Sequence, residues 1–167
     1  MMFPTAFLLL SLVSVVTSKY VNDFDKRFNY ECPSGKSIAS WKSYNSVYHG
    51  DRRYKFTCQN TPGLGYCQWH NYVNRFDQPI SFRCYNGVIT GVGSYHNSYY
   101  EDRRFSFNCC SLYRKRLVRC GWTGFVNNWN KDLNFRMPEG HFLKGVSSIH
   151  NNRYEDRRWK FETCAIQ

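Results

Sequence analysis

Three copies of one short motif divide the chain into repeats of about 50 residues. Each copy reads Asp-Arg-Arg, an aromatic residue, one further residue and Phe, and ends at a cysteine; the copies are Asp51–Cys58, Asp102–Cys109 and Asp156–Cys164. Each repeat opens on Val-Asn, and the three asparagines are 52 and 53 residues apart. Because units of this size seldom bury a core alone, we expect one domain over residues 19–167 with approximate pseudo-threefold symmetry. The repeats span about 20–58, 72–109 and 125–164.

The motif alternates between apolar and polar residues, as a strand with one buried face does. In the first copy, one face carries Arg52, Tyr54 and Phe56, and the solvent face carries Asp51, Arg53 and Lys55. The chain has only three alanines against 13 Tyr and 13 Phe, which argues against a helical bundle. We therefore predict an all-β, disulfide-braced domain, with a Gly-rich strand before each motif and a third strand before each repeat's first cysteine.

An apolar run over residues 6–16 is too short to span a membrane, which takes roughly 20 residues. It predicts a signal peptide over residues 1–18, cleaved before Lys19, and hence a secreted, extracellular protein. In an oxidising compartment the eight cysteines favour disulfides over a zinc site. We expect no metal and no cofactor.

Alignment of the repeats suggests which cysteines pair. Cys32 and Cys84 precede the motif in the first two repeats, and Met137 takes their place in the third. We therefore predict the within-repeat pairs Cys32–Cys58 and Cys84–Cys109. In this alignment Cys164 lacks a partner, so the remaining four cysteines allow three connectivities. Of these we favour Cys110–Cys120 with Cys67–Cys164.

The repeated acids Asp51, Asp102 and Asp156, with His49, His96 and His150 nearby, invite a catalytic interpretation. An enzyme usually assembles one asymmetric constellation from different residue types. Threefold repetition instead favours a structural clasp, in which an arginine stacks on an aromatic ring and pairs with a carboxylate while partly buried. No G-x-S-x-G, H-E-x-x-H or P-loop pattern occurs, and we predict a protein with no catalytic residues. The many Tyr and Trp side chains either fill the core or form a sugar-stacking surface.

The segment Tyr113–Cys120 is the most basic part of a chain whose net charge is +11. Clustered guanidinium and ammonium groups bind polyanions through charge pairing, and arginine forks grip sulfate groups. The alternative is a solvated basic loop without a ligand. We predict a polyanion site formed by Arg114, Lys115, Arg116 and Arg119. The next candidates, which repeat on the solvent face of the motif strands, are Arg53, Arg104 and Arg158.

The triple motif and the vicinal pair Cys109-Cys110, followed by a basic run, resemble the dermatopontin family. The family signature is Asp-Arg-x-Trp-x-Phe, and only the third copy carries its tryptophan, at Trp159. The resemblance implies a non-enzymatic protein of extracellular matrix and cell-surface contacts. Its implied partners are sulfated glycosaminoglycans, proteoglycans or cell-surface glycans and matrix proteins, and not nucleic acid. The strong positive charge favours the agglutinin-like invertebrate members. The alternative is a secreted cytolysin or defence toxin that acts on membranes.

Overall fold

The computed structural model describes residues 19–167, so the predicted signal peptide lies outside the described residues. The regular elements of this part are all strands, and the all-β, disulfide-braced class is confirmed. None of the described residues belongs to a helix long and apolar enough to cross a membrane. The strands are β1 (Phe28–Glu31), β2 (Lys36–Ser46), β3 (Asp51–Asn60), β4 (Leu64–His70), β5 (Ile80–Arg83), β6 (Gly87–Asn97), β7 (Asp102–Leu112), β8 (Leu117–Trp122), β9 (Leu133–Arg136), β10 (His141–Asn151) and β11 (Asp156–Ile166).

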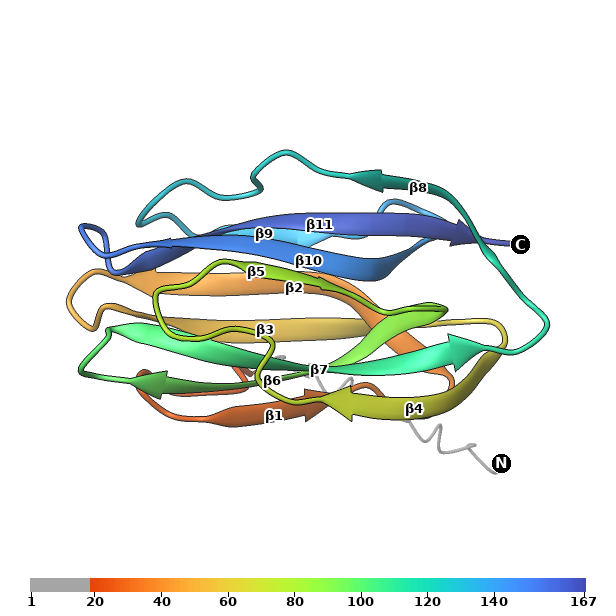
Figure 1. Cartoon of the computed structure of the whole chain (residues 1–167), viewed down its shortest axis with the longest axis horizontal. Coiled ribbons are helices and arrows are strands. Elements are labelled where there is room, and N and C mark those ends of the chain that lie inside the picture. The colour runs from red at the N-terminus through yellow and green to blue at the C-terminus, as the bar shows by residue number, and fades with distance from the viewer. Residues whose placement is uncertain (1–18) are drawn as a thin grey trace, which may run out of the picture.

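Three long antiparallel hairpins, β2–β3, β6–β7 and β10–β11, form the framework (Figure 1). The motif supplies the second strand of each hairpin, and the first strand is the segment before it. Each first strand shifts register once, and it does so at corresponding places: Ile38/Ser40, Ile89/Gly91 and Leu143/Gly145. The three hairpin turns lie together at one end of the molecule, at the left of Figure 1.

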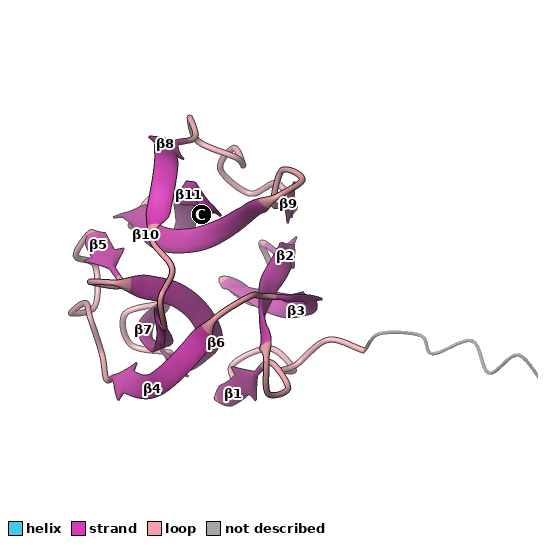
Figure 2. Cartoon of the chain, turned by 90° about the vertical axis from the view of Figure 1, so that its right-hand side faces the viewer, coloured by secondary structure: helices cyan, strands magenta, loops and turns pink. Residues whose placement is uncertain are grey.

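The predicted third strands are present before Cys32, Cys84 and Met137, but each pairs with the hairpin of another repeat. β1 joins β6, β5 joins β10 and β9 joins β2. The linking strands β4 and β8 then cover the outer edges of β7 and β11. The resulting sheets have the orders β1-β6-β7-β4, β5-β10-β11-β8 and β3-β2-β9. Every sheet therefore mixes strands from more than one repeat (Figure 2).

The three sheets enclose one core, which is built largely from aromatic side chains. Tyr54, Phe105 and Trp159 hold the same position in the three motifs and are at most 1% exposed. The Trp159 ring packs edge-on against Phe105, with centroids 4.9 Å apart, and lies 5.1 Å from Trp41. Edge and tilted aromatic contacts of this kind add to the free energy gained by burial. Much of the aromatic content therefore serves the core.

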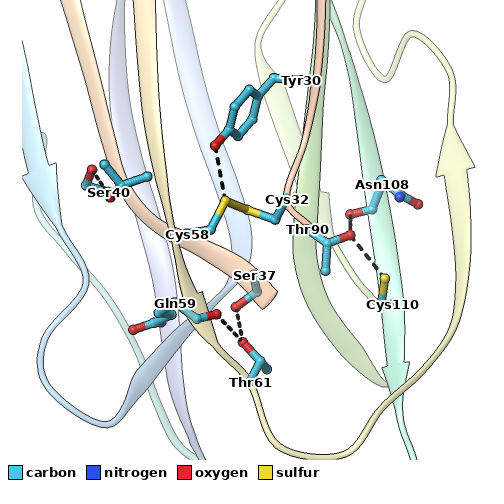
Figure 3. The surroundings of a disulfide bond; sticks show 11 residues. Tyr30, Cys32, Ser37, Ser40, Cys58, Gln59, Thr61, Thr90, Asn108 and Cys110 are labelled. Carbon is cyan, nitrogen blue, oxygen red and sulfur yellow. Dashed lines mark hydrogen bonds between the residues drawn. A yellow bond between two sulfur atoms is a disulfide. The ribbon is translucent and has the colours of Figure 1, made fainter. Parts of the chain in front are cut away.

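The predicted within-repeat disulfides Cys32–Cys58 and Cys84–Cys109 are both present. Although each joins cysteines of one repeat, it bridges two sheets, because β1 and β5 pair with the next hairpin. Cys32 follows β1 and is bonded to Cys58 on β3, where the Tyr30 hydroxyl lies 3.1 Å from the Cys58 sulfur (Figure 3). These bridges fasten neighbouring sheets to each other.

The predicted pairs Cys110–Cys120 and Cys67–Cys164 are wrong. The structure instead joins Cys67 to Cys110 and Cys120 to Cys164. Pairing of β4 with β7 places Cys67 directly opposite Cys110. Pairing of β8 with β11 brings Cys120 and Cys164 together at the point where that register shifts. Each of these bridges ties a linking strand to the hairpin that follows it.

The spacing of the cysteines contains a signal for this connectivity. Cys164 lies eight residues after Asp156, just as Cys110 lies eight after Asp102, whereas Cys109 lies only seven after it. Cys164 is therefore the counterpart of Cys110. The counterpart of Cys109 is Thr163, so the third repeat has lost both partners of its within-repeat bridge.

Candidate functional site

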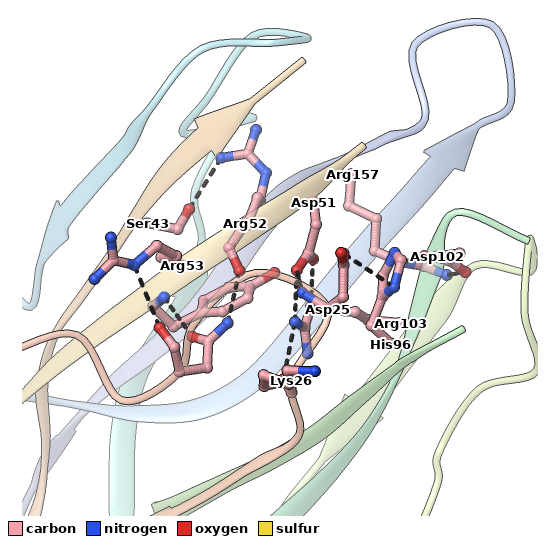
Figure 4. A network of polar contacts seen from close by, with 12 residues as sticks. Asp25, Lys26, Ser43, Asp51, Arg52, Arg53, His96, Asp102, Arg103 and Arg157 are labelled. Carbon is pink, nitrogen blue, oxygen red and sulfur yellow. Dashed lines mark hydrogen bonds and ion pairs between the residues drawn. The ribbon is translucent and has the colours of Figure 1, made fainter. Parts of the chain in front are cut away.

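The first arginines and the aspartates of the three motifs form a closed ring of ion pairs, here called the Asp-Arg ring. Figure 4 shows the part of it around Asp51, Arg103 and Asp102. Each arginine binds the aspartate of another repeat through both Nε and Nη2. The pairs are Arg52 with Asp156, Arg103 with Asp51, and Arg157 with Asp102. All six side chains are at most 3% exposed. Since every repeat supplies one carboxylate and one guanidinium, the ring ties each hairpin to both others.

The pair of Arg103 with Asp51 shows the geometry. Nε lies 2.5 Å from Oδ1 and Nη2 lies 2.7 Å from Oδ2. Asp51 also accepts the backbone N–H of Asp25 at 2.8 Å, and Arg103 also donates to the carbonyl of Lys26 at 3.1 Å. The prediction that Asp51 faces solvent is wrong, because a bidentate guanidinium and a backbone N–H together compensate the buried charge. The motif is a structural clasp between repeats.

Of the three histidines considered as catalytic candidates, His96 and His150 occupy corresponding positions, and His49 does not. His96 and His150 lie beside the Asp-Arg ring with side chains 1% exposed, and each is within 4 Å of two carboxylates. His49 instead stacks on Phe24, with ring centroids 4.3 Å apart. Burial raises the pKa of Glu101, which faces His96, and His96 opposes that rise. The three histidines do not converge on one site.

Asp77, Asp102 and His150 place three potential metal-ligand atoms within 4.8 Å of one another. Arg157 already binds both oxygens of the Asp102 carboxylate. A cation at this point would have to compete with that guanidinium for the same lone pairs. We therefore assign the three residues to the contact between the second and third repeats.

The second arginines of the motifs, Arg53, Arg104 and Arg158, are half-buried and not free on the solvent face. Each donates from Nε to the carbonyl of the asparagine that opens its repeat. Stacking and this hydrogen bond hold the guanidinium groups against the surface, and polyanion binding at these positions stays a prediction. Each group lies 4.1–5.9 Å from two ring centroids; the rings are Tyr20 and Phe24, Tyr72 and Phe76, and Phe125 and Trp129.

Three residues of the predicted basic cluster, Arg114, Lys115 and Arg116, lie on the connection between β7 and β8, which crosses the end of the molecule opposite the hairpin turns (Figure 1). The fourth, Arg119, lies in β8. We call Arg114, Lys115, Arg116 and Arg119 the basic loop. All four side chains are exposed, and none forms an ion pair with another residue of 19–167. Arg116 and Gln167 exchange two backbone hydrogen bonds of 3.0 Å, and Arg116 also donates to the Gln167 side chain. One disulfide stands on each side of the loop, so its ends are anchored although no bridge closes it.

A groove that the sequence analysis missed lies on the sheet β1-β6-β7-β4 and has a volume of about 880 Å³. Its wall includes Trp69, from the linking strand β4, and Asn29, from β1. The signal for it is the pair Gly91 and Gly93 in β6, since no other repeat has glycine at both of these positions. Side-chain-free positions in a strand mark a place where another group comes close to the backbone.

Comparison with known proteins finds a matching family model and three relatives. Residues 22–167 match the sequence model of the family described as Dermatopontin. The chain is 38% identical over 152 residues to the hemagglutinin/amebocyte aggregation factor of Limulus polyphemus, covering 90% of this chain and 59% of that protein. It is 39% identical over 71 residues to a dermatopontin of Biomphalaria glabrata, covering 42% and 48% of the two chains.

A third relative, Millepora cytotoxin-1 of Millepora dichotoma, is 36% identical over 146 residues, which are 86% of this chain and 65% of that protein. The chain thus spans between about half and two thirds of the length of these relatives. No solved structure matches it significantly.

Proposed function

The chain belongs to the dermatopontin family, and on that premise we propose that it is a secreted, non-enzymatic adhesion protein that binds sulfated glycosaminoglycans or cell-surface glycans. Its relatives include a dermatopontin and a hemagglutinin, which supports a role in matrix contact or in the aggregation of cells. The proposed mature protein is one domain over residues 19–167, released from a signal peptide at 1–18.

The basic loop is the observation that carries this proposal. Its four cationic side chains are exposed and unpaired within the described chain, so binding a polyanion breaks no existing ion pair. The anchoring of Arg116 to Gln167 limits the conformational entropy lost when the loop meets a flexible ligand. Sulfate groups then bind by charge-assisted hydrogen bonds, and several weak contacts add together.

We expect the simultaneous change of Arg114, Lys115, Arg116 and Arg119 to alanine to weaken heparin and dermatan sulfate binding at least tenfold, which corresponds to about 1.4 kcal/mol. The fold should persist, because no core side chain or cysteine changes. Binding of the parent protein should also fall steeply with salt, since the Debye length shortens to about 3 Å at 1 M. Surface plasmon resonance on immobilised heparin measures both effects.

A matched control separates a local site from net charge. Alanine at four other exposed basic residues, Lys42, Arg75, Arg136 and Arg153, removes the same charge from other parts of the surface. If this control loses as much affinity as the basic-loop variant, the site proposal fails and only the overall charge matters. Retained affinity in the control, with loss in the loop variant, supports the loop as the ligand site.

The likeness to Millepora cytotoxin-1 favours a second candidate function, in which the protein acts on membranes. A basic surface is attracted to anionic lipid headgroups. Release of dye from phosphatidylserine-containing vesicles that lack any glycan would support this toxin function over the adhesion function. Intact vesicles together with heparin binding would support adhesion.

A further inference from the structure

The groove on the sheet β1-β6-β7-β4 opens on the face turned away from the core. Strand register places Asn29, Gly93 and Ser106 side by side in one row across β1, β6 and β7. Trp69 on β4 stands in the next row. Val92 and Phe105, which point the other way, belong to the core. The groove is therefore a surface feature that two repeats and the first linking strand build together.

Two glycines make room for the indole ring that forms the floor of the groove. Trp69 reaches from β4 across β7, and atoms of its six-membered ring lie 3.0 Å and 3.6 Å from where a Cβ would stand on Gly91 and Gly93. Any side chain at Gly91 would displace the ring. A side chain at Gly93 would also press on the Asn29 amide oxygen, 3.0 Å away.

The middle of the groove is polar and aromatic without net charge. Besides Trp69, it presents the exposed amides of Asn29 and Asn71, the half-exposed ring of Tyr72 and the hydroxyl of Ser106. The Ser106 oxygen accepts the backbone N–H of Tyr72 at 3.1 Å, which leaves its own proton available to a ligand. The two amides form no hydrogen bond with other described residues. The charged lining residues Asp25, Lys26 and Arg27 come from the segment directly before β1.

The sheet β5-β10-β11-β8 has rows of residues that correspond to those of the groove, but the side chains in them differ. Trp122 stands where Trp69 does, Lys160 replaces Ser106, and Arg83 occupies the position held by Glu31 in the first repeat. Arg83 lies over Gly145, pairs with Glu162 at 3.0 Å and stacks on the Trp122 ring at 5.3 Å. The chain's own arginine therefore covers this tryptophan, whereas no cation among residues 19–167 stacks on Trp69.

We infer that the Trp69 groove binds a neutral pyranose residue of a glycan, at a site separate from the basic loop. A pyranose has one face of C–H groups, which suits an indole ring, and a rim of hydroxyls, which suits amide and hydroxyl side chains. The groove's volume of about 880 Å³ falls in the range of small-molecule sites. The inference deepens the proposed glycan-binding function, because it assigns sugar-ring recognition to the groove and charge recognition to the loop.

The test measures binding of methyl glycosides of galactose, glucose, mannose and N-acetylglucosamine to the secreted protein by saturation-transfer difference NMR and titration. We expect at least one of them to bind with an affinity that is unchanged between 50 mM and 1 M salt, because no net charge lies at the centre of the groove. Trp69→Ala should weaken that binding at least tenfold. Trp122→Ala is the matched control, since it makes the same change at the corresponding position and should leave binding intact.

The double variant Asn29→Ala with Asn71→Ala provides a second test in case Trp69→Ala misfolds. Both asparagine side chains are exposed, so the fold should persist, and the binding of the glycoside should weaken at least tenfold. The inference is overturned if none of the four glycosides binds, if the Trp69 and Trp122 variants behave alike, or if the affinity falls steeply with salt. Heparin binding of the Trp69 variant should match that of the parent. Glycoside binding that survives in the basic-loop variant supports the groove even if the polyanion proposal fails.

Discussion

Arg103→Ala is expected to lower the free energy of unfolding by about 3–5 kcal/mol, because it leaves the Asp51 carboxylate buried without its cation. The Asp51 side chain is only 2% exposed, and the lost guanidinium supplies two of its hydrogen bonds. The change also removes the donor to the Lys26 carbonyl. Since the ring joins all three hairpins, the loss should appear as a lower midpoint of a single urea transition.

Arg104→Ala is the matched control for this prediction. The neighbouring Arg104 is half-buried and stacks on Tyr72, but it pairs with no carboxylate in the described chain. We expect it to cost only about 1–2 kcal/mol, the scale of one cation–π contact and one hydrogen bond to a carbonyl. Equal losses in the two variants would mean that the ring contributes no more than surface stacking does.

Replacing both partners distinguishes two contributions to the free energy of unfolding: the cost of leaving one buried charge unpaired, and the net stabilisation from the ion pair itself. Arg103→Met together with Asp51→Leu removes the buried charges instead of leaving one alone. Because desolvation offsets much of the Coulomb attraction of a buried pair, this double variant should be more stable than Arg103→Ala alone. A double variant that unfolds as readily as the single one would show that the polar contacts themselves maintain the arrangement of the repeats.

The repeat pattern and its period of two are local features, which is why the sequence predicted the strands and the class of fold. The exchange of short strands between repeats is not local: β1, β5 and β9 have the same pattern whichever hairpin they join. Strand alternation also predicted the burial of Tyr54 and Phe56 but misplaced Asp51. At a hairpin corner the partner of a charged residue decides its burial, and here that partner comes from another repeat.

The two candidate sites, the basic loop and the groove, also differ in whether the sequence alone could predict them. The four exposed cations of the basic loop are visible in the sequence because they lie close together along the chain. The groove depends on Asn29, Gly93 and Trp69, which lie on three strands and meet only through the register of the sheet. The surroundings of Arg104 could not be predicted for a related reason, since the rings that cover it come from the segment before β5. Residues gathered from distant strands need the topology before they can be recognised as a site.

The third repeat offers a further test of how the repeats correspond. Met137 and Thr163 stand where the first two repeats have their within-repeat cysteines, and both side chains are buried. The Met137 backbone N–H binds the carbonyl of Ala39 at 2.9 Å, as the N–H of Cys32 binds that of Thr90 at 2.9 Å. The backbone is therefore held in the same way at the two positions, and a bridge of the same geometry should fit.

Met137→Cys with Thr163→Cys is expected to form a fifth disulfide and to raise the free energy of unfolding by about 3 kcal/mol, the loop-entropy effect for cysteines this far apart in sequence. The new pair would be separated by 26 residues, as Cys32 and Cys58 are. It would connect the sheet β3-β2-β9 to the sheet β5-β10-β11-β8, two sheets that none of the described disulfides connects to each other. Non-reducing peptide mapping identifies the bridge, and urea unfolding measures its effect. Each single variant serves as a control, since it has the same change in packing without the crosslink. Two free thiols in the double variant, or a bridge that leaves the urea midpoint unchanged, would contradict the assignment of Thr163 as the counterpart of Cys58 and Cys109.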